Sequence, residues 1–117
     1  MTRIGEQLSA LTATIEARRG ADPKESYTAS LLADPARCAK KLGEEGVEAA
    51  LAGALGDDTL ADEAADVLYH LAVMLAARDV SWDAVAERLA ARTGQSGHAE
   101  KAGRQRSDRS PTQSSRA

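Results

Sequence analysis

Five acidic residues with helical spacing are the part of this sequence best suited to chemistry. They form two groups, Glu44, Glu45 and Glu48 in the first, and Glu63 and Asp66 in the second. Residues three or four apart share one face of an α-helix, so each group would form an acidic ridge. Crowded carboxylates take up protons or bind a cation, and their hard oxygen atoms suit Mg²⁺ or Mn²⁺ better than zinc. The spacing therefore predicts a divalent-metal site, with Mg²⁺ as the expected ion.

A solvated helix face is the ordinary alternative for such a run, because glutamate is a good helix former. The second group weighs against it, since Glu63 and Asp66 stand among alanine, valine and leucine, where a charge needs a partner. Lys40 and Lys41 lie one turn before the first group, where they could form simple salt bridges or hold a substrate phosphate beside the metal. His70 continues the line of the second group, and we expect a buried, hydrogen-bonded histidine there rather than a metal ligand.

The helices that would carry these groups follow from apolar spacing and capping residues. We expect helices over residues 2–19, 35–55, 60–78 and 82–92. Asp34 and Pro35 favour a helix start, because Asp caps free amides and Pro fits the first helical position. The polar segment 24–30 is expected to be a loop with a short helical turn. A short connection at Gly56 should make the second and third helices an antiparallel hairpin, which can set the two acidic ridges opposite one another.

The expected helices, without any strand-like alternation, predict an all-α fold, a helical bundle of four to five helices. A chain of 117 residues is one domain's worth, and with 3% aromatic residues and no Phe its core must be thin. We therefore expect a homodimer in which a second copy covers an apolar face. Residues 1–93 are predicted to form the domain, and 94–117 a disordered polar tail, since that segment holds no aliphatic side chain larger than Ala.

Charge and cysteine content narrow the possible binding partners and the cellular location. The net charge is −3, and the tail holds five basic and two acidic residues, so the body is acidic and unsuited to nucleic-acid binding. Cys38 is the single cysteine, and the N-terminus shows no secretory signal, so we expect a cytoplasmic protein. The longest apolar run, Leu71 to Ala77, is far shorter than the roughly 20 residues needed to cross a bilayer.

The acidic groups also resemble a known signature. Glu44-Glu45-Gly46-Val47-Glu48, a spacer of 14 residues and then Glu63-Ala64-Ala65-Asp66 are similar to the E-E-x-x-E…E-x-x-D motif of the all-alpha nucleotide pyrophosphohydrolases, the MazG-like superfamily. Within it, Ser26-Tyr27-Thr28, Lys40-Lys41-Leu42-Gly43-Glu44-Glu45 and Asp66-Val67-Leu68-Tyr69-His70-Leu71 resemble the phosphoribosyl-ATP pyrophosphohydrolases of histidine biosynthesis. The resemblance spans about residues 4–89.

The resemblance implies a reaction and assigns roles to the motif residues. Phosphoribosyl-ATP would be hydrolysed to phosphoribosyl-AMP and pyrophosphate by attack of a metal-activated water on the α phosphorus. By resemblance, the metal ligands are Glu45, Glu48, Glu63 and Asp66. Glu44 would support this shell or hold a further ion, and Glu44 or Glu45 would take the water's proton.

The substrate's second phosphate needs cationic or hydroxyl partners. The predicted phosphate-binding residues are Lys40, Lys41, Ser26, Tyr27 and Thr28.

Two other functions remain open on the sequence alone. A housecleaning or dUTP-type pyrophosphohydrolase would use the same metal motif on a free nucleotide. A non-catalytic helical dimerisation module would carry the acidic ridges as surface decoration. Metal binding separates the second alternative from both enzymes, and the choice of substrate separates the enzymes from each other.

Overall fold

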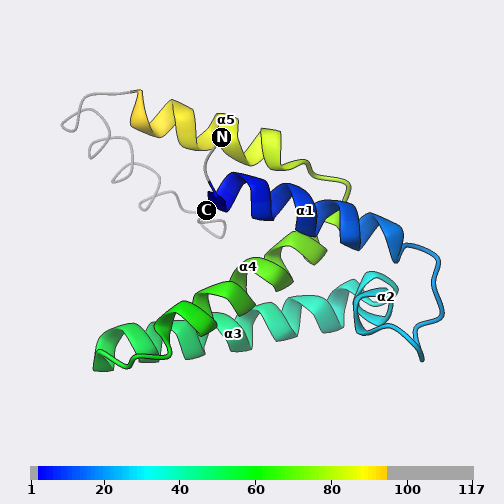
Figure 1. Cartoon of the computed structure of the whole chain (residues 1–117), viewed down its shortest axis with the longest axis horizontal. Coiled ribbons are helices and arrows are strands. Elements are labelled where there is room, and N and C mark those ends of the chain that lie inside the picture. Colours follow the sequence, from blue (N-terminus) through cyan, green and yellow to red (C-terminus); the bar gives the residue numbers. More distant parts are fainter. Residues whose placement is uncertain (1–2, 95–117) are drawn as a thin grey trace, which may run out of the picture. The chain divides into compact units, whose positions relative to one another are not determined.

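The computed structural model of this chain describes residues 3–94, and every regular element in that range is an α-helix (Figure 1). The five helices are α1 (Arg3–Ala17), α2 (Tyr27–Leu32), α3 (Pro35–Leu55), α4 (Leu60–Ala77) and α5 (Trp82–Thr93). The predicted all-α fold of four to five helices is therefore confirmed. The chain divides after Val80 into two compact units, with α1 to α4 in the first and α5 in the second.

Helix α3 has the bounds that its end residues predict. The Asp34 side chain accepts a hydrogen bond of 3.2 Å from the Arg37 backbone N–H, and Pro35 occupies the first turn. At the other end Gly56 has a φ of 69°, in the left-handed region that a residue without Cβ adopts at little cost. A long, well-capped helix thus carries the first acidic group.

Helix α2 is more ordered than the sequence suggested. A loop with a short turn was expected over 24–30, whereas the structure has a six-residue helix from Tyr27 to Leu32. Ser26 caps it by accepting a hydrogen bond of 3.1 Å from the Ala29 N–H. Ala29 and Leu31 are buried, and this tertiary packing compensates for the low stability of so short a helix. The other helix ends agree with their predicted positions to within two residues, a difference that is common at fraying helix ends.

The core of the first unit lies around a helical hairpin. Helices α3 and α4 run side by side with the most extensive contact among the described helices, and α1 and α2 pack against the hairpin (Figure 1). Each of the four helices supplies one of the largest fully buried side chains, Ile15, Leu31, Cys38 and Val73. The core is as thin as the composition predicted.

The second unit begins at Ser81, whose hydroxyl oxygen accepts a hydrogen bond of 3.0 Å from the Ala84 N–H and so caps α5. No residue of α5 is buried. The predicted tail lies outside the described residues except for Gly94. Among residues 3–94, no helix combines the length and the apolar character that spanning a membrane requires.

Candidate metal centre and active site

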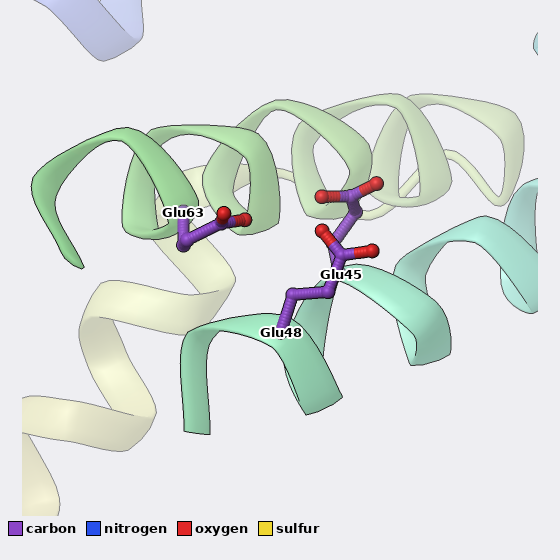
Figure 2. A group of neighbouring side chains, drawn as sticks. All are labelled: Glu45, Glu48 and Glu63. Carbon is purple, nitrogen blue, oxygen red and sulfur yellow. The ribbon is translucent and has the colours of Figure 1, made fainter. Parts of the chain in front are cut away.

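Three of the predicted metal ligands meet between α3 and α4. Glu45 and Glu48 project from α3 toward Glu63 of α4 (Figure 2), and one carboxylate oxygen of each lies within 4.8 Å of the other two. We call these three residues the carboxylate cluster. The antiparallel hairpin thus places part of each acidic ridge opposite the other, as its short connection predicted.

Two oxygen atoms of the carboxylate cluster are buried without a partner. Neither Glu45 Oε1 nor Glu63 Oε1 has a hydrogen bond within the described residues. No lysine or arginine of residues 3–94 forms an ion pair with the cluster. Burying a carboxylate oxygen without a partner costs free energy, and such groups usually pair or coordinate a cation. Hard oxygen donors with excess negative charge therefore fit a divalent cation such as Mg²⁺.

The pKa of Glu63 reflects the same crowding. Burial raises the pKa of Glu63 above its ordinary value, and the neighbouring carboxyl groups of Glu48, Asp66 and Glu45 raise it further. All of these effects disfavour the ionised form. A bound cation would act in the opposite direction, because its charge stabilises the carboxylate.

Asp66 and Glu44 lie apart from the three gathered oxygens. Asp66 is exposed and does not belong to the carboxylate cluster, although its charge still acts on Glu63. Glu44 forms an ion pair with Lys41, with 3.3 Å between Oε1 and Nζ. The structure therefore gathers three of the four predicted ligands, and the roles of Asp66 and Glu44 remain predictions.

The two predicted phosphate-binding lysines differ in their surroundings. The pKa of Lys41 is raised chiefly by its contact with Glu44, with smaller effects of Tyr27 and Glu45. Lys41 therefore stays charged and lies within electrostatic reach of both α2 and the carboxylate cluster. Lys40 is exposed and forms no ion pair with any described residue. Lys41 thus adopts the salt bridge that the sequence allowed, while Lys40 is free to meet an anion.

A second polar group joins α2 to α4 through His70. The ring Nδ1 lies 2.8 Å from the Asp66 carbonyl oxygen, and Nε2 lies 3.1 Å from the Tyr27 hydroxyl. A carbonyl only accepts, so Nδ1 carries a proton, and in the neutral ring Nε2 then accepts from the Tyr27 hydroxyl. With both nitrogens bonded and only 6% exposure, His70 is the buried, hydrogen-bonded histidine that was expected.

The neighbouring hydroxyls of α2 are also engaged. Thr28 Oγ1 shares a hydrogen bond with the Tyr69 hydroxyl, and the Tyr27 and Tyr69 rings stack at 6.3 Å between centroids. We call Tyr27, Thr28, Tyr69 and His70 the tyrosine–histidine network. Ser26 uses its oxygen as the helix cap, which leaves its O–H proton without an acceptor among the described residues.

Arg37 stands beside this network, and the sequence analysis did not single it out. Its guanidinium carbon lies 5.6 Å from the centroid of the Tyr27 ring, and its Nη1 donates to Ser30 Oγ at 3.0 Å. The signal in the sequence was spacing, since Arg37 precedes Lys41 by four residues and shares its side of the helix. That spacing alone gave no reason to separate Arg37 from an ordinary surface arginine.

The fold and the site define an all-helical protein whose central hairpin holds carboxylates fit for a divalent cation. Comparison with known families specifies the class further, because the family model for phosphoribosyl-ATP pyrophosphohydrolase matches residues 8–93. A phosphoribosyl-ATP pyrophosphatase of Caulobacter sp. (strain K31) is 61% identical over 105 residues, which cover 89% of this chain and 98% of the relative. One of Cereibacter sphaeroides (strain KD131 / KCTC 12085) is 62% identical over 99 residues, 83% of this chain and 96% of the relative. The chain belongs to the phosphoribosyl-ATP pyrophosphohydrolase family.

Proposed function

We propose that this chain hydrolyses phosphoribosyl-ATP to phosphoribosyl-AMP and pyrophosphate, the second step of histidine biosynthesis. One observation links the proposed reaction to the carboxylate cluster. Two carboxylate oxygens of the cluster, on Glu45 and Glu63, are buried without a partner among the described residues, in a chain that belongs to the phosphoribosyl-ATP pyrophosphohydrolase family. We place the reaction in the cytoplasm, where a free buried thiol such as Cys38 stays reduced.

The proposed cofactor is Mg²⁺, held by Glu45, Glu48, Glu63 and Asp66. Such an ion supplies positive charge to the phosphate oxygens and lowers the pKa of water near the α phosphorus. The donor set supports this choice, because carboxylate oxygens are the ligands that Mg²⁺ prefers. The excess negative charge of the cluster, visible in the raised pKa of Glu63, supports it as well.

The protein's own residues position the substrate and move the proton. Glu45, with one buried oxygen in the carboxylate cluster, is the better placed of the two predicted bases, because Glu44 is already paired with Lys41. The water oxygen bonds to the α phosphorus, its proton passes to the carboxylate, and the bond to the bridging oxygen breaks as pyrophosphate leaves. Lys40 and Lys41 contribute positive charge toward the phosphates, and Ser26 can donate its free hydroxyl proton.

The proposal includes a homodimer. Val47, Leu51 and Leu55 repeat every four residues along α3, and their exposed fractions are 60%, 56% and 79%. A long apolar stripe on a thin-cored unit favours burial against a second copy. Light scattering should therefore return about twice the mass of one chain. Leu51→Glu, which puts a charge into the stripe, should shift the protein toward monomer, whereas a monomeric wild type at micromolar concentration would refute the dimer.

A substrate panel tests the reaction. Pyrophosphate release should be measured for phosphoribosyl-ATP, ATP and dUTP with Mg²⁺ and after chelation. We expect phosphoribosyl-ATP to be preferred, and pyrophosphate rather than orthophosphate to appear. Equal efficiency on all three nucleotides would place the chain among enzymes that hydrolyse free nucleotides, and absence of both turnover and metal binding would favour the dimerisation module.

A further inference from the structure

We propose that Arg37 binds the phosphate of the substrate's added phosphoribosyl group and thereby determines specificity for phosphoribosyl-ATP over ATP. This inference rests on the proposed function and deepens it. It concerns the end of the substrate that does not react, because ATP carries the same triphosphate and lacks only the second ribose and its phosphate.

Arg37 is held in place before any ligand arrives. The Ser30 hydroxyl accepts from the guanidinium at 3.0 Å and donates to the Tyr27 carbonyl oxygen at 2.6 Å. The guanidinium also lies over the Tyr27 ring, within the distance of a cation–π contact. Tyr27 in turn is fixed by its hydrogen bond to His70. An arginine positioned in this way loses less conformational entropy on binding than a freely moving one.

The charge of Arg37 is uncompensated. Within residues 3–94 it has no carboxylate partner, whereas Lys41, one turn further along α3, is already paired with Glu44. A guanidinium presents several N–H donors in a planar fork, and one contact to Ser30 leaves most of that fork available. Phosphate oxygens match this geometry in a bidentate contact.

The position of Arg37 along α3 matches the layout of the substrate. Arg37 precedes Glu45 by eight residues and Glu48 by eleven, which is about 12 to 16 Å along the axis at 1.5 Å per residue. Phosphoribosyl-ATP is anionic at both ends, with the adenine between its triphosphate and its second phosphate. With the triphosphate at the carboxylate cluster, this separation would let the second phosphate lie beside Arg37 near the start of α3.

A matched set of variants tests the role of Arg37. Arg37→Met keeps the aliphatic stem over Tyr27 and removes the donors, Arg37→Lys restores charge without the fork, and Arg18→Met removes an exposed arginine from the turn after α1 as a control. We expect Arg37→Met to raise the KM for phosphoribosyl-ATP by about ten-fold or more, the effect of one charge-assisted phosphate contact. The change in kcat should be far smaller, the preference over ATP should fall by a similar factor, and Arg37→Lys should recover part of the loss.

The outcomes separate this inference from the proposed function. If wild type prefers phosphoribosyl-ATP and Arg37→Met retains its KM, the role of Arg37 is refuted while the function stands. If the melting temperature falls and all nucleotides lose efficiency equally, Arg37 only supports Tyr27 and the inference fails. A wild type without activity on phosphoribosyl-ATP overturns the proposed function itself.

Discussion

The two polar regions of the helical hairpin differ in how completely their groups are partnered. In the tyrosine–histidine network, both ring nitrogens of His70 and the hydroxyls of Tyr27, Thr28 and Tyr69 all have hydrogen-bond partners. In the carboxylate cluster, two buried oxygens have none among the described residues. Both regions use α4, and they are only one to two turns apart on it.

We interpret this difference as one between polar groups with a structural role and carboxylates that are proposed to bind a cation. A network in which every group has a hydrogen-bond partner fixes α2 against α4. Neither ring nitrogen of His70 is then available to a metal or a substrate. An incomplete cluster of like charges weakens the apo protein and becomes favourable once a cation is bound. Opposite responses of the two regions to mutation and to metal should follow.

The largest expected effect is on catalysis. Glu45→Gln should lower turnover of phosphoribosyl-ATP by at least about 100-fold, because even groups one shell away from a metal commonly contribute 10- to 100-fold. Turnover and Mg²⁺ dependence should be measured together, with Glu87→Gln on α5 as a control of the same chemistry outside the first unit. Near-normal turnover in Glu45→Gln would remove this residue from both the ligand set and the role of base.

Breaking the tyrosine–histidine network should mainly reduce stability. His70→Leu should lower the free energy of unfolding by about 2 kcal/mol, because it deletes a buried, doubly hydrogen-bonded ring. Urea denaturation in chelator measures this loss without a metal contribution. Tyr27→Phe and the double variant complete a cycle, and coupling of about 0.5 to 1.5 kcal/mol is expected. Strict additivity would mean that the Tyr27 to His70 bond contributes nothing.

A change at the start of α3, the helix that carries Glu45 and Glu48, should have a smaller effect on stability that does not depend on metal. Asp34→Ala removes the side-chain cap of α3 and should cost about 1 kcal/mol of stability. The same denaturation experiment with and without Mg²⁺ should show an equal loss in both conditions. A loss present only with Mg²⁺ would show that the cap also influences the carboxylate cluster.

The smallest expected effect is a gain in stability rather than a loss. In chelator, Glu63→Gln should be at least as stable as wild type, because it removes one of several repelling charges. The raised pKa of Glu63 means that folding favours its protonated form, so this contribution is fully present below the unfolded pKa and is lost as pH rises through the folded pKa. The advantage of the variant should therefore appear near neutral pH and vanish on acidification. Destabilisation by Glu63→Gln in chelator at neutral pH would make Glu63 a structural partner.

Much of the fold was encoded locally. Both ends of α3 were predicted to the residue, because Asp34, Pro35 and Gly56 act through backbone chemistry that does not depend on the rest of the chain. Helix α2 was not predicted as a helix, because six residues are too few to be stable alone and depend on burial of Ala29 and Leu31 against other helices. Local signals determined the long helices, whereas long-range packing decided that the short helix α2 forms.

The candidate site shows the same division between local sequence signals and tertiary packing. The sequence by itself determined that acidic side chains would line two facing helices, because helical periodicity and a short connection suffice for that. Only the tertiary structure decided that Glu45, Glu48 and Glu63 meet, because carboxylates on two helices come together only where the helices pack. The pair of Glu44 with Lys41 lies within one helix and was already allowed by the sequence. The tertiary structure also placed Arg37 over Tyr27, a contact between two helices that spacing along one helix does not reveal.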